Sequence, residues 1–151
     1  ALLVLQEMAL NGCQRLLREH LIASHVGIMV GYSKDVIPAT GGTIKMANAT
    51  NLYSHIKEYV NRLYEENTVN GYLIRRLGIS FSGLADESAE GYDLFTDFEA
   101  IERERRLENT VLAIKDKFGK NAMLRGFDLA DGATQITRNK LIGGHNGGEE
   151  I

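Results

Sequence analysis

The spacing of hydrophobic residues changes early in the chain, and each period predicts a different element. From Leu2 to His20 apolar residues recur every three or four positions, as they do in a helix with one buried side. From His25 to Ser33 the period is two, as in a strand with one buried face. The inner residues of this strand are expected to be Val26, Ile28, Val30 and Tyr32, and the outer ones His25, Gly27, Met29, Gly31 and Ser33.

A second strand and a second helix are predicted next. After a pair of glycines the segment "TIKMA" alternates again, with Thr43 and Lys45 on the outer side, and the simplest interpretation is a short strand antiparallel to the first. The segment "NATNLYSHIKEYVNRLYEEN" then has helical spacing, and Thr50 or Asn51 is expected to cap its N-terminus. Its buried side would consist of Leu52, Ile56, Tyr59, Val60 and Leu63.

The segment "LIRRLGISFSGL" predicts a third strand, after a turn at Asn70-Gly71. Its inner residues would be Leu77, Ile79 and Phe81, and its outer ones Arg76, Gly78, Ser80 and Ser82. The order helix, strand, strand, helix, strand predicts an α+β fold of the β-α-β-β-α-β type, with both helices on one face of the sheet. The first strand of that pattern would lie before Ala1, so the sequence is expected to be a piece of a longer chain.

Beyond Leu84 the chain is organised differently. The segment "GLADESAEGYD" consists of small and acidic residues with no regular hydrophobic spacing, which is typical of a linker. From Glu99 to Lys120 helical spacing returns in a charged helix, whose apolar stripe would be Leu107, Val111, Ile114 and Phe118. We therefore divide the chain into a domain at residues 1–85, a linker at 86–98, and a helical extension with a flexible tail at 99–151.

Composition and charge narrow the class of protein. The 151 residues are 44% hydrophobic and 25% charged, which suits one globular core with an extension, and no apolar run approaches the roughly 20 residues of a membrane span. The single cysteine, Cys13, cannot form an internal disulfide, as is typical of a cytoplasmic protein. Residues 1–85 hold 8 Lys or Arg against 6 Asp or Glu, whereas residues 86–151 hold 9 against 14, so the acidity lies in the second part.

The outer residues of the three predicted strands are unusually small. From Gly27 onward ten residues face outward, and three of them are glycine, which packs nothing and costs conformational entropy in a strand. A large partner is therefore expected to approach this backbone closely. Hydroxyl groups, one lysine and the arginines suit phosphate oxygens, but the residues alone leave two alternatives open, a nucleic acid or another protein domain.

Neither a catalytic site nor a metal site is predicted. The four histidines are scattered, with no cysteine at ligand spacing, and Cys13 has no histidine near it in the sequence. The glycine pairs are not followed by Lys and then Ser or Thr, so the sequence contains no phosphate-binding loop of the NTPase type.

Three segments, "EMALNGCQRLLREHLIASHVGIMVGYS", "GGTIKMANATN" and "IRRLGISFSGL", resemble the little finger, the C-terminal DNA-binding domain of Y-family translesion DNA polymerases. The bacterial UmuC-like branch is the nearest, because "LENTVLAIKDKFGKNAMLRG" and "ATQITRNKLIGGH" resemble the extension that follows the little finger there. The resemblance implies a non-catalytic role in DNA repair and SOS-type damage tolerance, in which the sheet grips primer-template duplex along its major groove.

In that family, residues matching the arginine pair and the small polar positions after it contact the template strand. The resemblance, together with the outer positions above, gives the expected DNA-binding residues Arg75, Arg76, Ser80, Ser82, Lys45, Thr43 and Ser33. Palm, fingers and thumb domains would precede this chain and carry the Mg²⁺-dependent nucleotidyl transfer, so no cofactor is expected in the chain itself.

The linker segment "EGYDLFTD" resembles the peptide Gln-Leu-x-Leu-Phe with which UmuC-like proteins dock on the sliding clamp. Leu94 and Phe95 match, whereas Gly91 replaces the glutamine and Tyr92 the first leucine. A sliding clamp is thus a second expected partner, and a protein-interaction module is the alternative function. The alternative for the peptide is that its apolar residues pack the tail onto the core.

Overall fold

The computed structural model describes residues 1–33, 36–91, 97–119, 141–142 and 145–146, and they form an α+β structure, as the sequence predicts. The helices and strands, in chain order, are α1 (Leu2–Arg18), β1 (Leu21–Tyr32), β2 (Thr40–Thr50), α2 (Tyr53–Asn67), β3 (Ile74–Asp86), the short 3-10 helix η2 (Glu87–Ala89), α3 (Phe98–Phe118), β4 (Leu141–Ile142) and β5 (His145–Asn146).

β1 is the central strand of a three-stranded antiparallel sheet with the order β2-β1-β3. β1 begins four residues earlier than predicted and ends at Tyr32, so the prediction that Ser33 belongs to the strand is wrong. The Ser33 amide instead donates a hydrogen bond to the carbonyl oxygen of Leu73 (2.8 Å), past the end of β1. β2 is longer than predicted, and β4 and β5 pair with each other in a second, two-stranded sheet.

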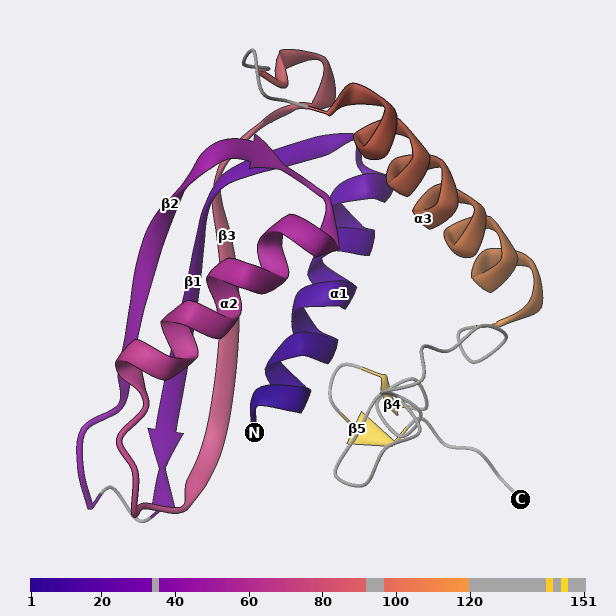
Figure 1. Cartoon of the computed structure of the whole chain (residues 1–151). Helices are drawn as coiled ribbons and strands as arrows, with labels where there is room; N and C mark the ends of the chain where they lie inside the picture. The colour runs from indigo at the N-terminus through magenta and orange to yellow at the C-terminus, as the bar shows by residue number, and fades with distance from the viewer. Residues whose placement is uncertain (34–35, 92–96, 120–140, 143–144, 147–151) are drawn as a thin grey trace.

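Figure 1 shows α1 and α2 on the same side of the sheet, which confirms the predicted layers. The core lies between these helices and the sheet, where burial of each large aliphatic side chain contributes about 1.5–3 kcal/mol. All four residues predicted to face inward on β1 are buried. The completely buried aliphatic side chains of the core include Leu5, Ala9, Val26, Val30, Ile56 and Val60.

Gly12 interrupts the helical sequence of α1 for a reason that lies on β3. A Cβ atom at this position would lie 2.2 Å from Cε2 of Phe81, well inside van der Waals contact. Glycine weakens a helix interior by about 1 kcal/mol relative to alanine. In exchange, its missing side chain lets the Phe81 ring pack directly on the backbone of α1, which brings the helix and the sheet close together.

α3 covers nearly the predicted range, but its buried side is not the predicted stripe. Leu107 and Phe118 are exposed to 59% and 68%, whereas Glu108 and Leu112 are buried. Each buried position lies one residue after a predicted one, and the predicted Val111 and Ile114 are half-buried, so the buried side is shifted around the helix axis from the predicted stripe. The helix therefore packs through a side that mixes polar and apolar residues.

Arg105 lies on that buried side and joins α3 to the domain. Its guanidinium group pairs with Glu87 (Nε to Oε1, 3.0 Å) and with Glu90. It also donates from Nη2 to Oδ1 of Asn51 (3.1 Å), a completely buried side chain whose Nδ2 donates to the carbonyl oxygen of Leu21 (3.0 Å). These polar contacts explain why α3 turns Glu108 and Leu112 inward and not its most apolar stripe.

A side chain of α3 also caps α2, so the prediction that Thr50 or Asn51 does so is wrong. The N-cap residue is Leu52, which makes no capping hydrogen bond through its side chain. The carboxylate of Glu104 instead accepts hydrogen bonds from the Ser54 amide (3.1 Å) and hydroxyl (2.6 Å). A negative charge is favourable at this end of a helix.

Candidate functional site

The side of the sheet away from α1 and α2 (Figure 1) is the outer face. The strand pairing aligns its residues in cross-strand rows. The rows consist of Lys45, His25 and Ser82; then Thr43, Gly27 and Ser80; then Gly41, Met29 and Gly78; and at the far end Gly31 with Arg76. Residues from three separate segments of the sequence thus form one continuous surface.

Met29 lies in the middle of the outer face between two glycines, and it is 43% exposed. A Cβ atom at Gly41 would lie 2.2 Å from the carbonyl oxygen of Ile28, so a side chain there requires the backbone to move. A Cβ atom at Gly78 would meet Cβ and Cε of Met29 at 3.6 Å, so the methionine lies across this glycine. A shallow depression of about 410 Å³ surrounds it.

Two hydroxyl groups converge over Gly27 in the neighbouring row. A Cβ atom at Gly27 would lie 2.8 Å from Oγ1 of Thr43 and 2.8 Å from Oγ of Ser80. The two oxygens therefore lean over the glycine from opposite strands. Hydroxyl groups donate to phosphate oxygens as well as accept, so this pair can bind an anion that approaches the bare backbone between them.

A β-bulge keeps both arginines on the solvent side of the sheet. Two adjacent residues of a regular strand point to opposite faces, which would turn one arginine toward the helices. Tyr32 pairs with Ile74 and Gly31 with Arg76, so Arg75 is an extra residue in β3. Both arginines are exposed as a result, and Arg76 extends over Gly31, where a Cβ atom would lie 2.9 Å from its Nε.

The three strands carry a positive charge that the whole chain does not. Lys45, Arg75 and Arg76 are cationic, and the one carboxylate in β1, β2 and β3 is Asp86, the last residue of β3. The Ser88 side chain and its backbone amide donate hydrogen bonds to Asp86, which lowers the pKa of that carboxyl group. The negative charge is thus at one end of the sheet, away from the arginines.

Six of the seven predicted DNA-binding residues lie on or beside the outer face, and Ser33 lies beyond its end. The structure adds His25, between Lys45 and Ser82, and its Nδ1 is 2.7 Å from the Ser24 hydroxyl. It also adds Met29 at the centre. The period of two places both on the outer face, but neither is a lysine, an arginine or a hydroxyl-bearing residue, the types expected from the sequence to bind phosphates.

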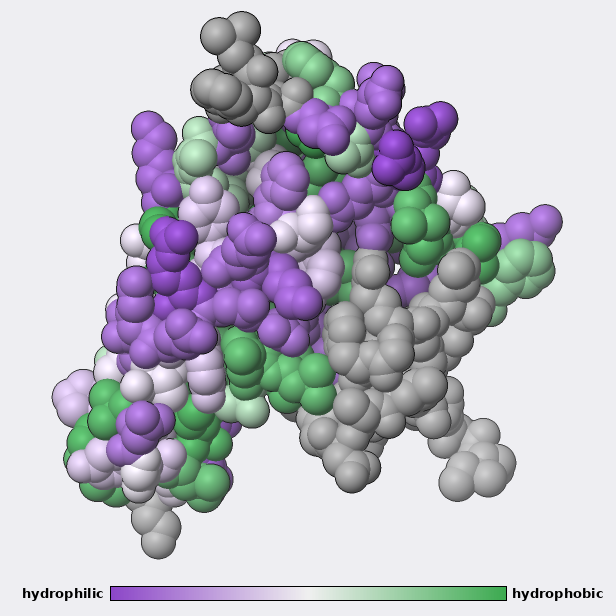
Figure 2. Space-filling model, viewed as in Figure 1, coloured by the Kyte–Doolittle hydropathy of each residue, from purple (hydrophilic) through white to green (hydrophobic). Residues whose placement is uncertain are grey.

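Hydrophobic side chains gather at the end of the sheet formed by the β1–β2 and α2–β3 loops, at the lower left of Figure 2. Exposed apolar residues of these loops are Val36, Val69, Tyr72 and Leu73. The Tyr72 ring packs edge-on against Tyr32, with 6.1 Å between centroids. The sequence does not predict this patch, because its members come from different loops and share no period.

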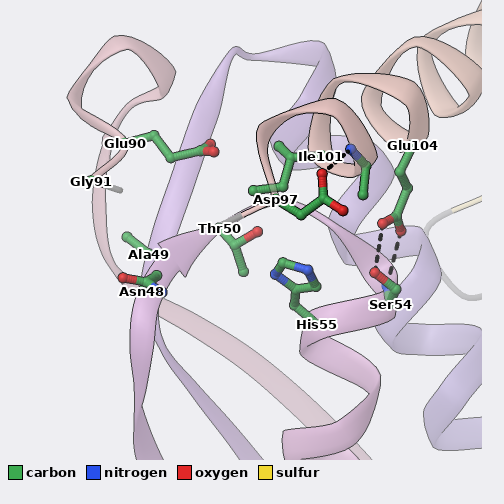
Figure 3. Close-up of a pocket in the computed structure, with 11 residues that line it drawn as sticks. Asn48, Ala49, Thr50, Ser54, His55, Glu90, Gly91, Asp97, Ile101 and Glu104 are labelled. Atoms are coloured by element: carbon green, nitrogen blue, oxygen red, sulfur yellow. Dashed lines mark hydrogen bonds between the residues drawn. The ribbon is translucent and has the colours of Figure 1, made fainter. Parts of the chain in front are cut away.

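A cavity of about 390 Å³ lies where the end of β2 meets the first turns of α2 and α3 (Figure 3). Its carboxylates already have partners: Glu104 binds Ser54, Asp97 accepts from the Ala100 amide (3.0 Å), and Glu90 pairs with Arg105. His55 also lines it. Because these groups are engaged in capping and ion pairing, the cavity is a junction between elements.

Metal binding needs several ligating side chains close together, and a membrane span needs a long apolar helix. Among the residues that the structure describes, no three His, Cys, Asp or Glu side chains are grouped so as to hold a metal ion. Within the same ranges, none of the helices combines the length and the apolar character needed to cross a bilayer. Tyr92, Leu94 and Phe95, the predicted clamp-binding residues, lie outside the described residues.

Comparison with known proteins gives one family. Residues 1–94 match the model of the impB/mucB/samB family C-terminal domain. The chain is 31% identical over 143 residues to a protein named DNA polymerase IV 2 from Halalkalibacterium halodurans, covering 94% of this chain and 34% of that protein. A protein of the same name from Bacillus subtilis is 27% identical over 143 residues, and the Putative UV-damage repair protein UvrX of that organism is 24% identical over 145, with the same coverage.

The chain spans about a third of the length of these curated relatives. The aligned part is longer than the family match, because it takes in 94% of the chain and therefore includes α3. No solved structure matches the chain.

Proposed function

Because the chain belongs to the impB/mucB/samB family of C-terminal domains, found in Y-family DNA polymerases, we propose that it binds primer-template duplex through its outer face. In this proposal the chain takes no part in the chemistry. Nucleotidyl transfer, with the Mg²⁺ that it needs, belongs to the palm, fingers and thumb domains of a cytoplasmic translesion polymerase acting in DNA repair and the SOS response.

One observation supports this proposal above the others, the composition of the rows on the outer face. Glycines at the centre let a partner approach the backbone, hydroxyl groups lean over Gly27, and cations occupy both ends. This set of donors fits the phosphates of a nucleic acid, which proteins contact through arginine, lysine, hydroxyl and backbone groups. A protein domain docking on the same face would need apolar area, and Met29 is the one exposed large apolar residue in the rows.

Salt dependence tests the proposal directly. If three to five phosphates are contacted, doubling the salt concentration is expected to weaken binding of the full chain to duplex DNA by about 6- to 20-fold, because binding releases condensed counterions. Fluorescence anisotropy with duplexes of unrelated sequence but equal base composition measures this, and affinities should be similar among them. Folded protein that fails to bind duplex DNA, or binds it with no effect of salt, would contradict the proposal.

We further propose that the linker recruits the sliding clamp through Leu94 and Phe95. Two features of the sequence support this proposal, the match to the peptide and its position between the segments that form η2 and α3. Leu94→Ala with Phe95→Ala is expected to abolish co-precipitation of purified clamp, because apolar anchors of this kind supply most of the affinity of such peptides. Phe98→Ala, an exposed residue just outside the peptide, serves as the control. Unchanged co-precipitation would favour the alternative that the peptide packs on the core.

A further inference from the structure

We infer that Met29 contacts the floor of the major groove in bound duplex, and that it favours the C5-methyl group of thymine. This inference rests on the proposed function, because it assumes that the outer face lies on duplex DNA. It concerns a different property, the dependence of affinity on base composition, which contacts to phosphates do not provide.

The dimensions of the outer face place Met29 between the two walls of the groove. Alternate residues of a strand are about 6.8 Å apart, so Gly31, beside Arg76, and His25, beside Lys45, lie about 20 Å apart along β1. The major groove of B-DNA is about 12 Å wide. Cations at the two ends of the face can therefore contact phosphates on both sides of the groove while Met29 faces the base edges between them.

Met29 is the side chain at the centre of the outer face, so it meets the base edges before the glycines around it. The neighbours in its own row are Gly41 and Gly78, and the next residues along β1 are Gly27 and Gly31 on the same face. The methionine is 43% exposed and lies across Gly78 within the depression that Gly27, Gly41 and Gly78 help to line.

The chemical groups exposed in the major groove determine which contact the Met29 side chain can make. Base edges there present hydrogen-bond donors and acceptors, and the one apolar group is the C5-methyl of thymine. A thioether side chain cannot donate a hydrogen bond and accepts weakly, so the thymine methyl is its best partner. Because methionine is unbranched and flexible, it can reach methyl groups in several registers, as a protein that moves along DNA requires.

Duplexes that differ in this methyl group test the inference. The full chain is titrated against an alternating dA·dT duplex and against the same duplex with deoxyuridine in place of thymidine, which removes the methyl group and keeps the pairing. The wild-type chain is expected to bind the thymidine duplex about fourfold more tightly for each methyl group that Met29 buries, from about 0.8 kcal/mol per buried carbon group. Met29→Ala should bind both duplexes equally.

The control is Leu84→Ala, which also removes an exposed apolar side chain, but one that lies on β3 outside the rows. This variant should keep the preference for thymidine. Equal binding of both duplexes by the wild-type chain would overturn the inference and leave the proposed function standing. A preference for thymidine that survives in Met29→Ala would do the same. Failure of the folded wild-type chain to bind either duplex would overturn both.

Discussion

Replacing Arg105 by alanine is expected to lower the free energy of unfolding by about 3 kcal/mol. Removing one partner of a buried ion pair leaves the other charges without compensation, and such changes cost about 3–5 kcal/mol. The Arg105 side chain is 14% exposed and that of Glu90 6%, so solvent can replace little of the lost contact. Glu87 and the buried oxygen of Asn51 lose a donor in the same substitution. Partial exposure of Glu87, at 24%, is the reason for choosing the lower end of the range.

Urea denaturation measures this effect, and Arg106→Ala is the matched control. Arg106 is the next residue of α3 and is exposed, so its loss should change stability by less than about 0.5 kcal/mol. Arg105→Lys should recover only part of the loss, because an ammonium group cannot reproduce the fork of hydrogen bonds to three partners. Equal stabilities of Arg105→Ala and Arg106→Ala would show that the ion pairs do not hold α3. Hydrogen exchange of the α3 amides distinguishes release of this helix from unfolding of the whole domain.

Replacing Arg75 and Arg76 together by alanine is expected to weaken duplex binding about 100-fold at fixed salt. A hydrogen bond to a charged group contributes at least about 1.5 kcal/mol, or about tenfold in affinity for each arginine. Both guanidinium groups contribute because the β-bulge at Arg75 leaves neither facing the helices. The loss should be the same for all sequences, and the slope of log affinity against log salt should fall by about two.

The control removes the same charge from the opposite side of the molecule. Lys57→Ala with Arg62→Ala takes two exposed cations from α2, which covers the other face of the sheet. Binding through the outer face should change far less in this variant than in the arginine pair, since these charges lie farther from the bound phosphates. An equal loss in the two variants would indicate that net charge alone governs binding. A loss confined to one DNA sequence would contradict contact with the backbone.

Most of the fold could be predicted because its signals are local. Side chains alternate strictly along a strand, so the period of two placed Val26, Ile28 and Val30 in the core and Gly27 and Met29 on the other face without any knowledge of neighbours. The same reasoning placed Thr43, Lys45, Ser80 and Ser82 outside. The resemblance to Y-family C-terminal domains, carried by the same segments, is confirmed by the family match over residues 1–94.

The errors at the start of α2 and on the buried side of α3 have a common cause, which is contact between side chains far apart in the sequence. Asn51 is a good helix cap by type, yet it is buried and binds Arg105, 54 positions away, while Glu104 caps α2 from 50 positions away. Because Arg105 binds Asn51 on the domain, α3 exposes Leu107 and buries Glu108. Hydrophobic spacing cannot detect this, since ion pairs and caps depend on which segments meet.

The sequence by itself therefore determined the elements, the side of the sheet that each residue occupies, and the family. The tertiary structure alone decided the cross-strand register that aligns Thr43, Gly27 and Ser80, the bulge that keeps both arginines outside, and the rotation of α3. The physical reason is distance along the chain. Backbone geometry sets the direction of a side chain from its immediate neighbours, whereas register and polar side-chain contacts arise only when segments 15 to 54 residues apart are brought together.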